Sequence, residues 1–167
     1  MDFFETVANR HSCRSFDSKP VEDARLRKIL EACNSAPSAH NSQAYKIFVV
    51  KDKTRRIALA AACLGQVFVS AAPVVLVFCH EKKAGLMQRG GVFPIQDATI
   101  AASYCQLAAT AQGLGSVWVG AFSPSLVRKI VGAPDDLEPL AVIPIGYAKG
   151  ALRKTPRKKL EELVVGF

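Results

Sequence analysis

A short basic stretch near the N-terminus carries the side chains best suited to binding an anion. Residues 10–16 are Arg10-His11-Ser12-Cys13-Arg14-Ser15-Phe16, so two arginines, a histidine and two serines fall within six positions. Guanidinium groups suit phosphate because their planar fork donates paired, charge-assisted hydrogen bonds, each worth roughly 1.5–3 kcal/mol. The stretch predicts a grip on the phosphate of a nucleotide-type ligand. A solvated loop whose arginines cap neighbouring helices would explain the same residues.

The composition predicts a single globular domain. The 167 residues are enough for one domain with a substantial core, and 50% of them are hydrophobic while 22% are charged. No repeat and no linker divides the chain, so residues 1–167 are expected to form one domain, with 148–167 as an extended C-terminal tail. The net charge of +8 favours anionic partners, which include both nucleic acid and a small phosphorylated ligand.

The cysteines and the N-terminal residues indicate a reducing compartment. Five cysteines, at positions 13, 33, 63, 79 and 105, form no C-x-x-C pair, which argues against a disulfide scaffold and against a zinc site. The acidic start of the chain lacks the basic region of a secretion signal. The apolar segment 57–78 is interrupted by Gly65 and Pro73, so a helix and a buried strand are expected there instead of a membrane span. We expect a cytoplasmic protein with no membrane partner.

Periodicity and capping signals predict helices packed on a sheet. Asp2 and Glu5 resemble a capping box at the start of a helix over 2–9. Apolar residues at helical spacing predict an amphipathic helix around 26–33, and an alanine-rich run predicts a central helix over 95–112 that Asp97 caps. Ser123 or Ser125 is expected to cap a helix through 131. The predicted strands are 47–50, 73–79, 116–122 and 140–145, which gives an α+β fold.

Six segments, in order and at consistent spacing, resemble the FMN-dependent nitroreductase family. They are residues 10–16, residues 36–43 (Ala-Pro-Ser-Ala-His-Asn-Ser-Gln), Asp97 at the alanine-rich helix, residues 113–122 (Gly-Leu-Gly-Ser-Val-Trp-Val-Gly-Ala-Phe), Ile145-Gly146-Tyr147, and residues 156–162 (Pro-Arg-Lys-Lys-Leu-Glu-Glu). The chain is identified as a short member of this family. The resemblance implies a nitroreductase-like α+β fold, with a central mixed or antiparallel sheet flanked by helices. It also implies an intertwined homodimer with FMN at the interface.

The resemblance assigns the phosphate end of the flavin to both termini. Arg10, Ser12 and Arg14 would bind the FMN phosphate and the polar edge of the ribityl chain or pyrimidine ring, and His11 would contribute its backbone. From the tail, Arg157, Lys158 and Lys159 would close around the phosphate. A dianionic phosphate needs converging cations, which is independent support for two distant basic segments meeting. A solvated extension is the alternative explanation for the tail.

The other matched segments would face the isoalloxazine ring. Pro37, Ser38, Ala39, Asn41 and Gln43 match a loop that reaches the flavin of the partner subunit, and amide side chains can serve both donors and acceptors of its edge. Gly120 and Ala121 match a segment whose backbone faces the flavin, where small residues permit close approach. No catalytic side chain and no metal are expected, because the flavin carries the chemistry.

Three departures from the family pattern bear on the pocket. Many relatives have Pro-Trp where this chain has Ala44-Tyr45, and a large branch has Glu-Gly where this chain has Gly120-Ala121. The loop between Cys79 and Ile95 is too brief for the helical insertion that roofs the pocket in larger members. The site is therefore expected to be open, or covered only by residues 82–91.

The resemblance implies an oxidoreductase that transfers a hydride from NADH or NADPH through FMN to a small organic acceptor. Nitroaromatics, quinones, activated alkenes and flavins are all suitable acceptors. One alternative is a flavoprotein of the same fold that does not use NAD(P)H, such as an oxidase, a dehalogenase or a flavin-degrading enzyme. A remote alternative is a basic nucleic-acid-binding domain, which the lack of interleaved aromatic and basic residues disfavours.

Cys13 is the one thiol with a basic setting in the sequence. It lies between Arg10 and Arg14, whose positive charges are expected to favour its thiolate form. The other cysteines have apolar neighbours and are expected to fill the core.

Overall fold

A four-stranded antiparallel sheet forms the centre of the molecule. The structure is a computed structural model that describes residues 1–82, 92–150 and 155–166. The strand order is β1-β2-β4-β3, and β2 pairs with β1 on one side and β4 on the other. The strands are β1 (Tyr45–Val50), β2 (Val74–Glu81), β3 (Gly115–Ser116) and β4 (Leu137–Gly146). The predicted α+β class is confirmed, and every pairing between named strands is antiparallel.

Strand β2 is apolar without alternation because both faces of the sheet are covered. Val75, Val77 and Cys79 belong to one buried cluster, whereas Val74, Leu76 and Phe78 belong to the other. All six side chains are at most 1% exposed. The two clusters form the core of the domain, one on each side of the sheet.

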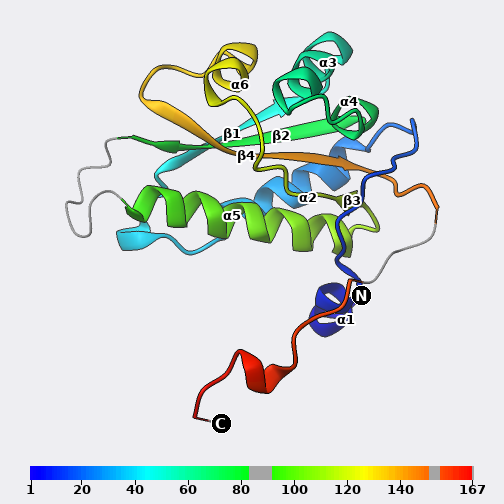
Figure 1. Ribbon diagram of the computed structural model, residues 1–167, viewed down its shortest axis with the longest axis vertical. Coiled ribbons are helices and arrows are strands. Elements are labelled where there is room, and N and C mark those ends of the chain that lie inside the picture. Colours follow the sequence, from blue (N-terminus) through cyan, green and yellow to red (C-terminus); the bar gives the residue numbers. More distant parts are fainter. Residues whose placement is uncertain (83–91, 151–154, 167) are drawn as a thin grey trace.

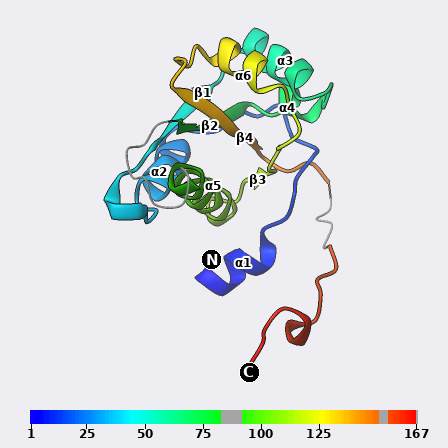
Figure 2. The same ribbon diagram turned by 60° about the vertical axis from the view of Figure 1, so that its left-hand side comes forward.

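Helices lie on both faces of the sheet, in three layers (Figures 1 and 2). One face is covered by α3 (Lys53–Ala62), α4 (Phe68–Ala71) and α6 (Pro124–Val131), and the other by α2 (Asp23–Asn34) and α5 (Val92–Ala111). The short helix α1 (Phe3–Asn9) and the C-terminal tail with η2 (Leu160–Glu162) lie beyond the α5 side, outside these layers. A further short 3-10 helix, η1 (Ala39–Asn41), follows α2.

Local signals predicted several element boundaries correctly. The side chain of Asp2 accepts from the backbone N–H of Glu5, and the carboxylate of Glu5 accepts from the backbone N–H of Asp2, which is the predicted capping box. Helix α6 begins after Ser123, as predicted, although the Ser123 side chain makes no capping hydrogen bond. In the segment 57–78, the predicted helix and strand are present, with the additional short helix α4 between them.

Two predictions about local structure are wrong. The predicted strand over 116–122 is confined to Gly115–Ser116, with an isolated bridge between Val119 and Val142 farther along. Asp97 does not cap the central helix, because α5 begins five residues earlier, at Val92. The predicted cover of the site by residues 82–91 lies outside the described residues, apart from Lys82, which pairs with Glu138 at 3.0 Å. No helix within the described ranges combines the length and hydrophobicity needed to span a bilayer.

Candidate functional site

The basic segment Arg10–Phe16 is held at the edge of the sheet. The backbone N–H of Cys13 donates to the carbonyl oxygen of Ser116 at 2.9 Å, so the segment runs as a parallel extension beside β3. On its other side, the N–H of Lys149 donates to the carbonyl oxygen of Ser15 at 2.9 Å. Cys13 and Phe16 are buried, while Ser12, Arg14 and Ser15 are exposed. The segment is therefore anchored by its apolar residues and presents its polar side chains to solvent.

A glycine makes this close approach possible. A Cβ atom on Gly115 would lie 2.7 Å from the Cβ and 2.8 Å from the Sγ of Cys13. Contacts this short do not occur between real side chains, so only glycine lets the basic segment pack against β3.

The basic segment and the chain that follows β4 enclose a polar pocket of about 430 Å³. Donors from both sides line it, and its lining includes His11, Ser12, Arg14, Ser15, Lys149 and Thr155. The imidazole of His11 faces the backbone through its Nδ1, which lies 3.1 Å from the carbonyl oxygen of Asn9. Hydroxyl, guanidinium and ammonium groups on one concave surface are the donor set that a phosphate ester with a polar chain requires.

Arg10 and Arg157, near opposite ends of the chain, act on each other electrostatically. Partial burial lowers the pKa of Arg10, and the positive charge of Arg157 lowers it further. Within the described residues, no carboxylate forms an ion pair with Arg10, Arg14 or Arg157. Two cations with no neighbouring acid repel each other, so an anion bound between them would stabilise this arrangement. The residues present fit the phosphate of FMN.

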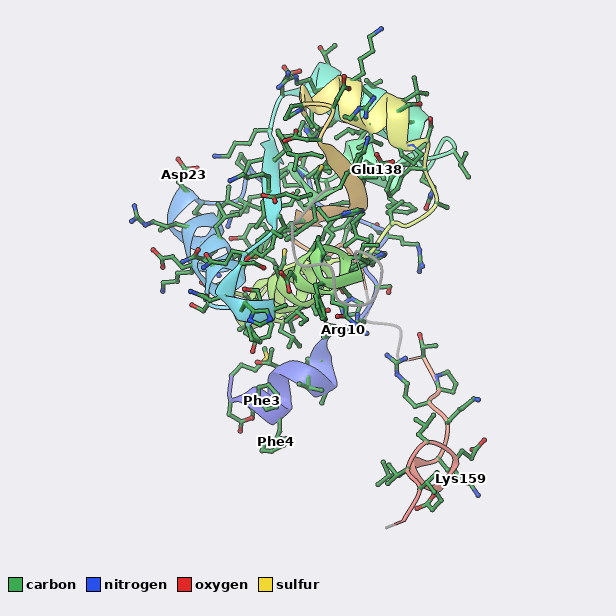
Figure 3. The ribbon with its side chains drawn as sticks, turned by 90° about the vertical axis from the view of Figure 1, so that its left-hand side faces the viewer. Phe3, Phe4, Arg10, Asp23, Glu138 and Lys159 are labelled. Atoms are coloured by element: carbon green, nitrogen blue, oxygen red, sulfur yellow. The ribbon has the colours of Figure 1, made fainter. Side chains whose placement is uncertain are left out.

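The three predicted tail residues, Arg157, Lys158 and Lys159, are all exposed. Figure 3 shows Lys159 on the distal part of the tail, well away from Arg10, which lies where α1 meets the body of the domain. The charge of Arg157 acts on Arg10, and the roles predicted for Arg157, Lys158 and Lys159 all stay predictions.

The predicted loop Pro37–Gln43 has a strained backbone. His40, Asn41 and Gln43 adopt φ angles of 53°, 56° and 49°, in the left-handed region that residues with a side chain seldom occupy. Each such residue costs of order 1–3 kcal/mol, and this kind of strain is concentrated at functional sites. The Nε2 of Gln43 donates to Oδ1 of Asn41 at 3.1 Å, so the two amide side chains of the loop are joined.

Asp97 is the residue that sequence reasoning placed wrongly. Its side chain is 2% exposed, and Oδ1 accepts from the N–H of Ala39 while Oδ2 accepts from the hydroxyl of Ser42, each at 2.9 Å. Asp97 therefore holds the loop onto α5 instead of capping the helix. Its signal in the sequence is that it is the single charged residue of α5.

Gly120 and Ala121 are exposed and lie between β3 and α6. The Nε2 of Gln66 donates to the carbonyl oxygen of Ala121 at 3.3 Å, which ties this stretch to the segment before α4. A Cβ on Gly120 would lie 3.6 Å from Nε1 of Trp118, an ordinary contact, so packing within the chain does not require glycine there. If glycine is required at position 120, the close contact that requires it is made by a bound ligand or by a partner chain.

One chain does not gather all the predicted site residues. The loop Pro37–Gln43 packs at Asp97, near the start of α5, whereas the basic segment packs beside β3, which follows the end of α5 at Ala111. At 1.5 Å per residue, Asp97 and Ala111 are separated by roughly 20 Å along the helix. The phosphate-binding residues and the loop therefore form two separate groups on the surface.

The prediction of a thiolate at Cys13 is wrong. The Cys13 side chain is 5% exposed, and burial raises the pKa of the thiol above its ordinary value. The Sγ atom donates to the carbonyl oxygen of Ser15 at 3.1 Å, so the proton has an acceptor. Cys13 packs inward, whereas Arg14 is exposed. Among the described residues, no three His, Cys, Asp or Glu side chains are grouped as a metal site would require.

Comparison with known proteins places this arrangement in a family. The model of the nitroreductase family matches residues 7–81 and 64–147. The chain is 32% identical to an NADH dehydrogenase of Thermus thermophilus over 99% of this chain and 96% of that protein. It is 29% identical to an FMN reductase [NAD(P)H] of Bacillus subtilis, over 93% and 70% of the two chains. An FMN-dependent nitroreductase of Clostridium difficile superposes with a TM-score of 0.85 at 28% identity, covering 98% of both chains. The chain belongs to the nitroreductase family.

Proposed function

We propose that the protein is an FMN-dependent oxidoreductase that uses NADH or NADPH to reduce a small organic acceptor. The single observation that carries this proposal is the pocket between the basic segment and the chain after β4, which hydroxyl and cationic groups line. Relatives named for FMN, NADH and NAD(P)H support the choice of cofactors. A nucleic-acid-binding role gains nothing from this geometry, because Arg14 and Lys149 line a concave pocket and not an extended surface.

The chain's own residues hold and orient the cofactor. Arg10, Arg14 and Arg157 neutralise the phosphate, and the hydroxyls of Ser12, Ser15 and Thr155 donate to its oxygens and to the ribityl chain. FMN supplies, when bound, the hydride acceptor and donor of the reaction. Asn41, Gln43 and the backbone of Gly120 and Ala121 hydrogen-bond the ring edge, and they exclude water from one of its faces.

The complete site needs a second copy of the chain. Phe3 and Phe4 are 65% and 80% exposed on α1, and Phe4 points away from the domain in Figure 3. An apolar groove between α1 and α5, lined in part by Tyr104, Leu107 and Ala108, continues this surface. Apolar area of this kind is buried by a partner. In the homodimer, the loop Pro37–Gln43 of one subunit completes the flavin site whose phosphate residues belong to the other.

A spectrum of the purified protein, followed by reduction, tests this function. We expect a yellow protein that releases FMN on denaturation and whose flavin absorbance is bleached anaerobically by NADH or NADPH. Bound FMN that neither nucleotide bleaches would favour the alternative flavoprotein without NAD(P)H, such as an oxidase or dehalogenase. A colourless protein that cannot be loaded with FMN would contradict the proposal.

A further inference from the structure

Three residues of the loop Pro37–Gln43, namely His40, Asn41 and Gln43, have positive φ angles. Asn and His adopt this region more readily than most residues with a side chain, whereas Gln seldom does. Such a backbone persists only where neighbouring groups determine it. The contacts that hold it therefore decide how Asn41 and Gln43 are presented.

One buried carboxylate ties the loop to α5. Asp97 receives the N–H of Ala39 on one oxygen and the hydroxyl of Ser42 on the other, both at 2.9 Å. These two donors flank His40 and Asn41, so the carboxylate spans two of the three residues with positive φ. The hydroxyl oxygen of Ser38 also accepts from the N–H of Gln43 at 3.1 Å, which closes the loop from within.

The chemistry of the site explains why a carboxylate is present. Both partners in the loop are donors, and a carboxylate offers two acceptor oxygens with no donor of its own. A buried charge is costly unless it is hydrogen-bonded, and Asp97 is 2% exposed in a helix with no other charged residue. Packing of α5 alone would be satisfied by an apolar side chain at this position.

We propose that Asp97 is a positioning residue, which holds residues 38–43 in the strained conformation that presents Asn41 and Gln43 to the flavin. This inference rests on the proposed function for the identity of the ligand. The two hydrogen bonds by which Asp97 holds the loop lie within one chain and do not depend on the ligand. Asp97 does not touch the reacting atoms and acts only through the loop.

Three variants and a matched control test the assignment. Asp97→Ala removes both acceptors. Asp97→Asn keeps one acceptor for the N–H of Ala39 and gains an amide donor for the oxygen of Ser42, so it rescues the geometry. Ser42→Ala removes one of the two bonds and leaves the helix untouched. Thr110→Ala is the control, because Thr110 lies buried on the same helix and its hydroxyl donates only to the carbonyl oxygen of Gln106.

Two measurements are made on each variant: the dissociation constant for FMN, and hydrogen exchange of the Ala39 and Gln43 amides in the flavin-free protein. In Asp97→Ala we expect the dissociation constant to rise about 10- to 100-fold and the two amides to lose protection. Asp97→Asn is expected to stay within about 5-fold of the parent, and Ser42→Ala to weaken binding about 3- to 10-fold. Thr110→Ala is expected to lower the stability to urea and to leave the dissociation constant and the protection of the two amides unchanged.

The results separate this inference from the proposed function. If Asp97→Ala and Ser42→Ala bind FMN like the parent and keep the Ala39 amide protected, Asp97 is not a positioning residue. If Asp97→Ala does not fold, Ser42→Ala decides by the same two readouts. If the parent protein does not bind FMN, the proposed function fails. Hydrogen exchange at the Ala39 amide then still shows whether Asp97 holds the loop. Unchanged protection of this amide in both Asp97→Ala and Ser42→Ala would show that it does not.

Discussion

The backbone N–H of Cys13 donates to the carbonyl oxygen of Ser116 at 2.9 Å, and this bond joins the basic segment to the edge of the sheet. The segment comes so close because residue 115 is glycine, where a Cβ would lie 2.7 Å from the Cβ of Cys13. The position of the candidate phosphate site therefore depends on residue 115 having no side chain.

Gly115→Ala is expected to displace the basic segment. The added methyl group overlaps Cys13, and overpacking of this kind costs about 1–3 kcal/mol of unfolding free energy. Binding of FMN weakens as well, because the segment carries Arg10 and Arg14. Urea unfolding and an FMN titration measure the two effects.

Ser116→Ala is the neighbouring control. The hydroxyl of Ser116 is buried and has no hydrogen-bond partner among the described residues, so its removal is expected to leave the unfolding free energy unchanged or raise it by up to about 1 kcal/mol. Parent-like FMN affinity in Gly115→Ala would show that the packing of Cys13 on β3 does not position the site.

The five cysteines are expected to be unreactive in the native protein, since all five are buried. Burial raises the pKa of Cys63 to about 11 and, together with Glu138, that of Cys79 to about 12, and it also raises the pKa of Cys13. A raised pKa means less thiolate at neutral pH, and the thiolate is the reactive form. A chromogenic disulfide reagent at pH 7 therefore reacts slowly until urea exposes the thiols. Rapid native reaction at Cys13 would mean that its thiol is accessible.

Tyr147 and Glu22 make stability depend on acid pH. The hydroxyl of Tyr147 donates to Oε2 of Glu22 at 2.6 Å, and this bond is the largest cause of a Glu22 pKa of about 2, against an ordinary 4.5. Because the folded pKa is the lower one, the stabilisation is present above pH 4.5 and is lost as the pH falls toward 2. In Tyr147→Phe we expect the free energy of unfolding to fall less than in the parent as the pH drops from 4.5 toward 2. Urea unfolding at several pH values measures this.

Glu22→Gln removes the titrating group, so the free energy of unfolding is expected to depend less on pH over the same range. A Tyr147→Phe protein that keeps the full pH dependence of the parent would contradict the assignment of Tyr147 as the main cause.

Phe4→Asp is expected to dissociate the proposed homodimer. The Phe4 ring is 80% exposed on α1, and burying a Phe side chain is worth roughly 1.5–3 kcal/mol, so the dimer weakens by at least about tenfold. Flavin content falls with it, because the proposed site is shared. Leu126→Asp is the control, since Leu126 is also exposed but lies on α6, on the opposite face of the sheet. Sedimentation velocity shows whether Phe4→Asp is monomeric while Leu126→Asp stays dimeric. A parent protein that is monomeric and still carries flavin would contradict the shared site.

Local patterns predicted much of the fold. The capping box of Asp2 and Glu5, the helical spacing from Leu26 to Cys33 and the apolar run of β2 each depend on near neighbours, and all three are present in the structure. The strand predicted over 116–122 failed because its apolar residues pack without a continuous partner strand. Pairing of that kind is set by distant parts of the chain.

The candidate site was less accessible to sequence reasoning, for the same reason. The basic character of residues 10–16 is visible in the sequence, but the inward turn of Cys13 depends on Gly115, about a hundred positions away. The partners of Asp97 lie 58 and 55 residues before it, so its role as the anchor of the loop Pro37–Gln43 could not be read from its neighbours.

The most direct test compares FMN with riboflavin, which lacks only the phosphate, in titrations of the parent, Arg10→Ala and Arg27→Ala. Arg27 is the control, because its exposed side chain pairs with Glu31 at 2.9 Å on α2. With two or more charge-assisted contacts of roughly 1.5–3 kcal/mol each, the parent and Arg27→Ala are expected to prefer FMN by at least about 100-fold, and Arg10→Ala to lose at least about tenfold of that preference. Equal affinity of the parent for the two flavins, or an unchanged preference in Arg10→Ala, would contradict the account.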